Sequence, residues 1–306
     1  MSTPVILDCD PGHDDAIALL LALGSPELEL LGVTTVAGNQ TVEKTTANAI
    51  RVLELAGADV PVAAGADRPL VREAFVAAYV HGETGLDGPD LPPPRARPVG
   101  QHAVDFLAER ITGATLVATG PLTNIALLLA RHPRSRPERL VLMGGAIAEG
   151  NVTPAAEFNI WADPEAAARV FATELDITMV GLDVTHRALL TDVHAAKLRE
   201  NGRIGGVVAD LLDFYAAFHK QVYEFDGSPI HDAVAVAQVI RPDLLELRLL
   251  NVEVDCESTL CRGRTVVDVW GRTAREPNAN VAVGVDAGGF IGLLLERLGR
   301  LDAKTS

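Results

Sequence analysis

Four aspartates occur within eight positions near the N-terminus of this 306-residue chain. Asp8 and Asp10 follow the apolar run 5–7, which predicts a buried strand, and their spacing of two puts both side chains on one face. Asp14 and Asp15 open an apolar helix, where negative charge is favourable. That preference leaves Asp8 and Asp10 unexplained, because clustered carboxylates repel one another in a partly buried crevice. Oxygen-only ligands predict a hard divalent cation among them, Ca²⁺ or Mg²⁺.

Further polar residues follow the expected strands 28–36 and 114–118. Asn39 comes just after the first of these, where open α/β sheets place ligands, although a turn role suits Asn equally well. Thr119 comes just after the second. The following Gly120 allows close backbone approach and Pro121 suits a first helical turn, so the carbonyl of Thr119 could point into a crevice.

The segment 150–159 (GNVTPAAEFN) carries amides and an acid but little helical or strand character. Asn151, Glu157 and Asn159 could together donate and accept hydrogen bonds to several sugar hydroxyls. Alternatively, this segment is a polar surface loop, but the apolar Phe158 within it argues against full exposure.

Two histidines are candidates for proton transfer or hydrogen bonding to a ligand. His231 and Asp232 open an apolar helix, and adjacent helical residues point about 100° apart, so one could reach a metal and the other a ligand. A surface position, or a buried one with satisfied hydrogen bonds, would explain His231 as well. His81 begins the Pro- and Gly-rich loop 81–94, and such loops often bind ligands. An exposed histidine in a loop, however, more often has no functional role.

Strands and helices alternate along most of the chain. This order predicts an α/β fold: one open, mostly parallel sheet flanked by helices on both faces, with a small antiparallel extension near the C-terminus. No repeat or linker divides residues 1–306, so we expect a single domain. The carboxyl ends of the strands would gather Asp10, Asn39 and Thr119 in one crevice.

Composition narrows the classes of partner. The net charge of −15 argues against binding to nucleic-acid backbones. The apolar run 16–23 is too short to span a membrane, and no signal peptide is evident. The three cysteines show no metal-ligand or disulfide spacing, so we expect a reduced, cytoplasmic protein.

The motifs DCDPGHDDAIALLLAL, VAGN, HGETGLDG, TGPLTNIA, GNVTPAAEFNIWADPEAA and IHDAVAV together resemble the nucleoside hydrolase family, from Asp8 to at least Val236. The resemblance implies a Rossmann-like fold and hydrolysis of the N-glycosidic bond of ribonucleosides. It also implies one bound Ca²⁺ per subunit and a homotetramer or homodimer.

The resemblance assigns roles to the candidates by position. The implied metal ligands are Asp10, Asp15, Asp232 and the carbonyl of Thr119, with Asp10 also the general base for a Ca²⁺-activated water. The implied ribose contacts are Asp14, Asn39, Asn151, Glu157 and Asn159. His231 would face the base, and we add His81 and Phe158 as substrate contacts. Histidine at position 231 resembles the inosine-uridine and pyrimidine-preferring branch, which predicts uridine, cytidine or inosine as substrate.

The residues themselves suit this reaction. Cleavage of a ribosyl C–N bond builds oxocarbenium character on the sugar, which carboxylates favour. The departing base needs a proton or a hydrogen bond, and His231 is the candidate whose ordinary pKa lies near neutrality. No phosphate cradle is evident among these motifs, which favours a nucleoside over a nucleotide.

Two other functions fit parts of the pattern. An aspartate-nucleophile, Mg²⁺-dependent phosphatase would also begin with a strand and Asp-x-Asp, here Asp8 and Asp10, but would leave Asp14 and Asp15 unexplained. A non-catalytic nucleoside-binding or Ca²⁺-binding protein on the same scaffold would bind ribose without turnover.

Overall fold

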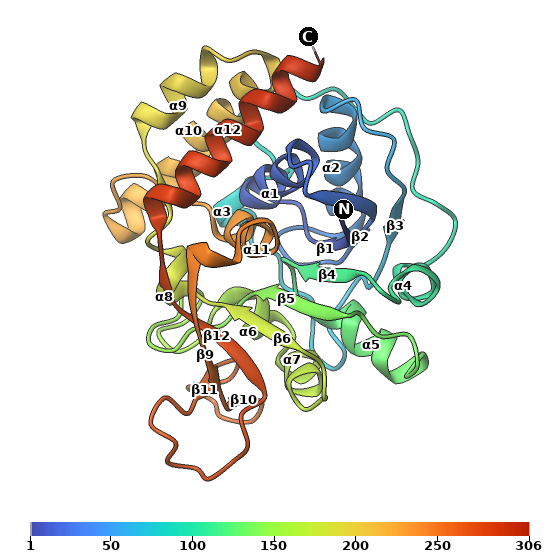
Figure 1. The fold of residues 1–306 in the computed structure, drawn as a ribbon, viewed down its shortest axis with the longest axis vertical. Helices are drawn as coiled ribbons and strands as arrows, with labels where there is room; N and C mark the ends of the chain where they lie inside the picture. The colour runs from blue at the N-terminus through green and yellow to red at the C-terminus, as the bar shows by residue number, and fades with distance from the viewer. Residues whose placement is uncertain (1, 306) are drawn as a thin grey trace.

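A computed structural model describes residues 2–305. Its centre is an eight-stranded sheet in which every neighbouring pair is parallel except the last, β12 and β9. Figure 1 shows this sheet with helices on both faces. In spatial order its strands are β3 (Val62–Ala64), β2 (Leu28–Thr35), β1 (Thr3–Cys9), β4 (Thr115–Ala118), β5 (Arg139–Met143), β6 (Ile177–Val180), β12 (Ala279–Val285) and β9 (Leu245–Leu250).

Side-chain alternation along β1 explains why both faces are covered. Val5, Leu7 and Cys9 pack into one hydrophobic cluster, whereas Ile6 packs into the other. The larger cluster lies under α1 (His13–Gly24), α2 (Val42–Leu55), α8 (Leu182–Thr185), α9 (Asp192–Arg199), α10 (Arg203–Tyr223), α11 (His231–Ile240) and α12 (Ala287–Thr305). The smaller lies under α4 (Ala103–Arg110), α5 (Thr123–Arg131), α6 (Phe158–Ala162) and α7 (Pro164–Phe171).

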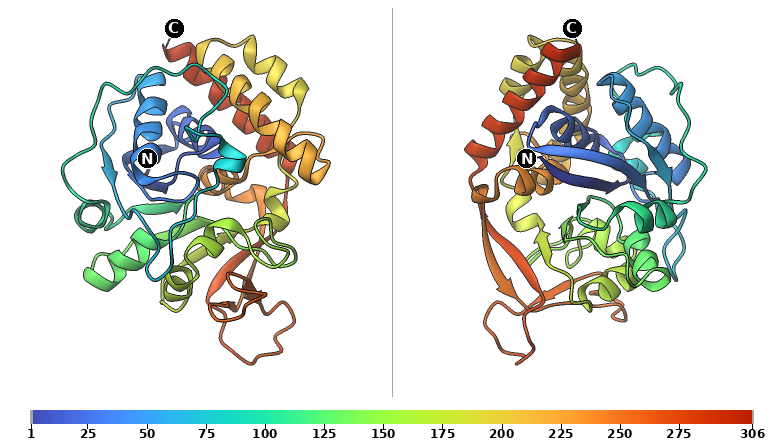
Figure 2. Two further views of the ribbon diagram at one scale, coloured as in Figure 1. Left: turned by 180° about the vertical axis from the view of Figure 1, so that it is seen from behind. Right: turned by 45° about the vertical axis from the view of Figure 1, so that its right-hand side comes forward.

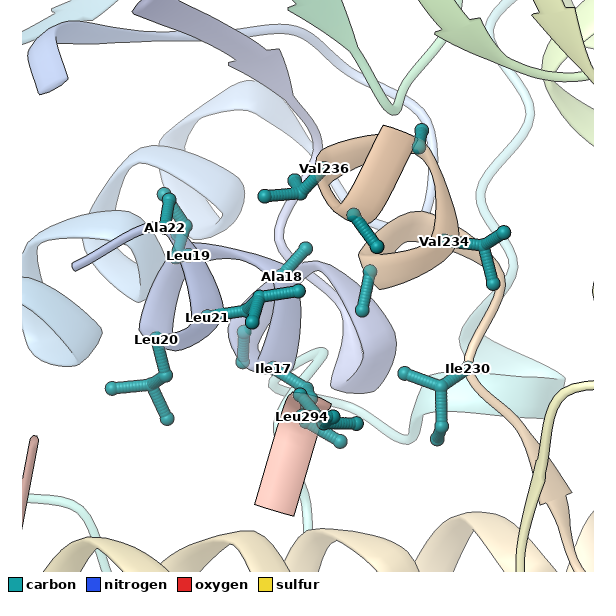
Figure 3. Packing of buried hydrophobic residues seen from close by; sticks show 14 of the residues in the cluster. Ile17, Ala18, Leu19, Leu20, Leu21, Ala22, Ile230, Val234, Val236 and Leu294 are labelled. Carbon is teal, nitrogen blue, oxygen red and sulfur yellow. The ribbon is translucent and has the colours of Figure 1, made fainter. Parts of the chain in front are cut away.

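Helix α1 is buried along nearly its whole length, and α11 packs beside it. Figure 3 shows residues 17–22 of α1 in one cluster with Val234 and Val236 of α11 and with Leu294 of α12. This contact fixes the two helices side by side. It brings together their first turns, which carry Asp14, Asp15 and Asp232.

The fold class expected from the sequence is confirmed, with differences in detail. A short helix, α3 (Ala78–His81), begins just before the expected loop, and the strands expected over 28–36 and 114–118 are each one residue shorter. The antiparallel extension consists of β9 and a lobe holding the hairpin β10 (Val252–Val254) and β11 (Thr265–Val267), which projects at the bottom of Figure 1. The remaining short elements are β7 (Leu189–Leu190), β8 (Ser228–Pro229) and the 3₁₀ helix η1 (Pro242–Leu244).

No helix between residues 2 and 305 combines the length and the apolar composition that a membrane crossing needs.

Candidate active site

A cleft opens beyond the carboxyl ends of the central strands, where open α/β sheets bind ligands. It is lined by ten of the twelve side chains selected from the sequence: Asp14, Asn39, His81, Thr119, Asn151, Glu157, Phe158, Asn159, His231 and Asp232. The other two, Asp10 and Asp15, are fully buried, and Asn39 contacts both of them.

Three buried carboxylates form the acidic end of the cleft. One oxygen each of Asp14, Asp15 and Asp232 lies within 4.8 Å of the other two. Asp15 is held by the start of its own helix, since its Oδ2 accepts a 3.0 Å hydrogen bond from the Gly12 N–H. Its Oδ1 accepts the Thr119 hydroxyl at 2.8 Å. The structure thus places Asp14, a predicted ribose contact, among the predicted metal ligands.

Asp10 lies next to this group. Its Oδ2 accepts the Asn39 N–H at 2.6 Å, and its Oδ1 is buried without a hydrogen-bond donor from residues 2–305. Two glycines make room for it: a Cβ at Gly38 would lie 2.1 Å from Oδ2, and one at Gly120 2.7 Å from Oδ1. A buried carboxylate oxygen without a donor is costly, so this arrangement suits a nearby cation.

The pKa values of these carboxyls lead to the same conclusion. Burial, followed by the charge of Asp15, raises the pKa of Asp14 to about 8. Burial and the neighbouring carboxylates raise the pKa values of Asp10 and Asp232 well above the ordinary value of 3.8. The group cannot ionise fully on its own. An oxygen-coordinated divalent cation would supply the missing charge, so the residues present fit the expected metal.

Asp8 does not join this group, although the sequence spacing placed it on the same face as Asp10. Its Oδ1 accepts hydrogen bonds from the Thr34 hydroxyl on β2 and from the Asn124 amide at the start of α5. The reason is that β1 ends at Cys9, so strand alternation does not continue to Asp10. Burial raises the pKa of Asp8 to about 6.

Three polar side chains predicted to bind ribose are fixed by the backbone around them. Asn159 donates from Nδ2 to the carbonyls of Thr119 (2.8 Å) and Met143 (3.2 Å). Glu157 caps α6, accepting the N–H groups of residues 145, 159 and 160, and burial raises its pKa to about 7. Asn151 Oδ1 accepts the Phe158 N–H at 2.9 Å. These contacts preorganise the amide and acid wall of the cleft.

Two buried histidines form the other end of the cleft. His231 is buried, and its Nδ1 lies 2.7 Å from the Thr185 hydroxyl. Burial, then His186 and other histidines, lowers its pKa well below the ordinary value of 6.5. His81 is only 5% exposed, with Nδ1 3.0 Å from Nδ1 of His13, and is therefore not an exposed loop residue.

Sequence reasoning missed the aromatic face of α10. Tyr215, Phe218, His219 and Tyr223 recur at helical spacing and line the cleft, as do Tyr79 and His186. Their signal was present in the sequence, since only 4% of this chain is aromatic and the α10 residues cluster on one helix. We assigned no function to this segment from its sequence.

Comparison with known proteins gives concordant matches. A family model described as inosine-uridine preferring nucleoside hydrolase matches residues 5–292. The pyrimidine-specific ribonucleoside hydrolase RihA of Shewanella sp. strain ANA-3 is 51% identical over 307 residues, covering 97% of this chain and 96% of that protein. The RihA of Salmonella typhimurium is 48% identical over 310 residues, covering 97% and 99%.

Solved structures give the same fold. A purine-preferring ribonucleoside hydrolase from Gardnerella vaginalis superposes with a TM-score of 0.93 at 36% identity, covering 99% of this chain and 100% of that one. A plant nucleoside hydrolase, PpNRh1, superposes with a TM-score of 0.92 at 34% identity, covering 97% and 99%.

Proposed function

Because the chain belongs to the inosine-uridine preferring nucleoside hydrolase family and is a ribonucleoside hydrolase, we propose that it cleaves pyrimidine ribonucleosides with one Ca²⁺ per subunit. The observation that carries this proposal is the buried group of Asp14, Asp15 and Asp232, next to an Asp10 oxygen without a donor, in a cleft lined by amides. The family resemblance leads us to expect a homotetramer or homodimer, and the cysteine content leads us to expect a cytoplasmic location.

The ion would be held by Asp10, Asp15, Asp232 and the Thr119 carbonyl, with Asp14 close enough to take part. Several carboxylates with a carbonyl suit Ca²⁺ better than Mg²⁺, which usually keeps several waters and uses one or two carboxylates. When bound, such an ion supplies positive charge that lowers the pKa of a nearby water molecule. The Thr119 carbonyl already accepts one hydrogen bond from Asn159 and retains a second lone pair.

Asp10 would act as the general base. The Asn39 N–H holds Oδ2, which leaves Oδ1 to take a proton from the attacking water. Water then adds to the anomeric carbon of the ribose as the C–N bond breaks and its electron pair leaves with the base. The phosphatase alternative loses its support here, because Asp8, its other required carboxylate, is hydrogen-bonded inside the sheet.

The ribose would be bound by the amide and carboxyl side chains that line the cleft. Asn39, Asn151 and Asn159 offer neutral donors and acceptors, and Asp14 and Glu157 offer carboxyl oxygens. The carboxylates favour the positive charge that develops on the ring, so contacts to the ribose strengthen as the bond breaks.

His231 would act on the leaving base as a neutral imidazole. If the Thr185 hydroxyl donates to Nδ1, the proton of the ring resides on Nε2. That N–H then donates to the base as negative charge develops there. The lowered pKa of His231 argues for this hydrogen-bonding role over that of a preformed imidazolium acid.

The preference for pyrimidines rests on the relatives. The proteins about half identical to this chain are named pyrimidine-specific, whereas the purine-preferring one is 36% identical. The test is release of free ribose from uridine, cytidine, inosine and adenosine, with chelator and after Ca²⁺ is restored. We expect kcat/KM for a pyrimidine nucleoside to exceed that for inosine by about tenfold or more.

Each part of the proposal can fail separately in that assay. Equal or higher turnover of inosine would overturn the base preference alone. Full turnover after exhaustive chelation would overturn the metal. Nucleoside binding without ribose release would favour the non-catalytic alternative, and phosphate release from a phosphomonoester would favour the phosphatase.

A further inference from the structure

Strand β9 is the edge of the large sheet and pairs only with β12 among the strands that the structure describes. The right-hand view of Figure 2 shows β12 and β9 along the left margin of the molecule. The carbonyls of Leu250 and Leu244 accept N–H groups from residues 278 and 286, so the even-numbered residues of β9 turn their backbone groups toward β12. Leu247 and Leu249 therefore direct their N–H and C=O groups outward, as does the carbonyl of Leu245, whose N–H already donates to the Pro242 carbonyl.

The side chains of β9 carry opposite charges two residues apart. Glu246 and Arg248 are exposed, and neither forms an ion pair with a side chain of residues 2–305. Glu246 lies over Gly284, and Arg248 uses Nη2 to donate to the Val269 carbonyl at 3.0 Å, which leaves its other nitrogens available. Leu249 is 61% exposed.

We propose that a second copy of this chain pairs antiparallel with β9, about a two-fold axis at Leu247. In this register Leu247 faces its own counterpart and the two exchange both backbone hydrogen bonds, while the Leu245 carbonyl accepts the N–H of the partner's Leu249. Glu246 then lies opposite the partner's Arg248, and the symmetry produces this pair twice.

Charge selects this register over its neighbours. A two-fold axis at Glu246 would place two glutamates opposite each other, and one at Arg248 two arginines. An axis between two residues would place a residue whose backbone groups face outward opposite a partner residue whose backbone groups face β12, so the two could not form hydrogen bonds. Only the axis at Leu247 gives opposite charges and matched hydrogen-bonding groups along β9.

The lobe beyond β9 carries exposed apolar side chains. Leu260 and Trp270 are 83% and 85% exposed, and Trp270 follows the Val269 carbonyl that Arg248 contacts. Antiparallel pairing places this lobe beside the start of β9 in the other copy.

Alternatively, the charged side chains of this edge strand serve only to prevent pairing with another strand, and the experiment must distinguish these two roles.

The decisive experiment is a charge exchange. Glu246→Arg and Arg248→Glu are made singly and together, and subunit number is measured by sedimentation equilibrium over a range of protein concentrations. We expect each single variant to weaken self-association by about tenfold or more, because two attractive pairs become repulsive. The double variant, in which the pairs are attractive again, should regain the wild-type mass.

A second pair of variants tests the backbone directly. Leu249→Pro removes an N–H that faces away from β12, whereas Leu249→Ala shortens the side chain but keeps that N–H. We expect the proline variant to dissociate and the alanine variant to stay associated, with circular dichroism and uridine hydrolysis confirming that both are folded. A monomeric wild type, unchanged single variants, or a double variant that fails to reassociate would each overturn the interface.

Discussion

The two ends of the cleft respond to burial in opposite ways. At the acidic end, burial raises the pKa values of Asp10, Asp14 and Asp232, so these carboxyls resist ionisation until a cation joins them. At the histidine end, burial lowers the pKa values of His81 and His231, so these imidazoles are neutral. The acidic end therefore needs a bound cation, whereas the histidine end offers neutral hydrogen-bond donors and acceptors.

The two ends also differ in how they are held. The acidic end depends on backbone geometry: the first turns of α1 and α11 and the close approach of residues 38 and 120. The histidine end depends on ring packing, in which His13 stacks on Phe214 and Tyr215, with centroids 5.1 and 5.4 Å away. We infer that catalytic power comes mainly from the first end and discrimination between bases mainly from the second.

The largest expected effect is at the acidic end. Asp10→Asn should lower kcat for uridine by about a thousandfold, because the amide cannot take the proton of the attacking water. Asp8→Asn is the matched control, since this nearby aspartate lies outside the cleft and an amide oxygen can keep the two hydrogen bonds that Oδ1 accepts. Steady-state ribose release measures both. Equal losses in the two variants would indicate damage to β1, and full activity in Asp10→Asn would exclude it as the base.

At the histidine end, His231→Ala should lower kcat by about a hundredfold through loss of a donor to the base. Because His231 is neutral in the folded protein, the ratio of wild-type to variant kcat should stay constant from about pH 6 to about pH 8. His132→Ala, a half-buried histidine beside Asp105, should keep wild-type activity. A ratio that falls steeply as the pH rises through 6.5 would show that a protonated His231 is needed.

Stability in Ca²⁺ should depend on pH in a defined direction. The pKa values of the buried carboxyls are raised in the folded protein. Between about pH 4 and about pH 8 the ion-free folded protein therefore holds protons that the unfolded chain has released. The free energy of unfolding of the ion-free protein falls as the pH rises through this range. Ca²⁺ must displace those protons. The stabilisation by saturating Ca²⁺ over chelator should therefore grow by about 2 kcal/mol between about pH 6 and about pH 8.

Thermal unfolding in parallel buffers measures this difference. The histidines affect both samples alike, so their titration cancels in the comparison. A stabilisation that is constant or shrinks with rising pH would mean that the ion does not compete with protons for these carboxyls.

The smallest effect concerns Thr185. Thr185→Val removes the hydroxyl that holds His231 Nδ1, and kcat should fall by about fivefold, with a change in the ring tautomer visible by nitrogen NMR. Thr185→Ser keeps the hydroxyl and should restore both properties. Loss of activity without a change of tautomer would point to packing of α8 instead.

Much of the acidic end could be predicted from the sequence. The carboxylates of the opening motif lie on one strand end and one helix start, and both elements follow from local apolar patterns. The helix start at residues 231–232 suggested that one of these side chains could reach a metal, but only the family resemblance implied that Asp232 shares an ion with Asp15. The spacing of Asp8 and Asp10 suggested a shared face, but that inference requires a strand continuing past Cys9.

The histidine end was less predictable. The loop composition around His81 indicated exposure, but α10 covers it, and the burial that lowers its pKa comes from residues far away in the chain. The aromatic residues of α10 could have been recognised by their helical spacing. Their role as a cleft wall depends on where α10 packs.

The sequence by itself determined the order of strands and helices and the types of side chain at their ends, because apolar periodicity, turn residues and helix-starting residues act over a few positions. Tertiary structure alone decided which carboxylates meet, which histidines lose their charge and which strand keeps a free edge. Each of these depends on desolvation and on neighbours supplied by distant segments, and no local pattern encodes either.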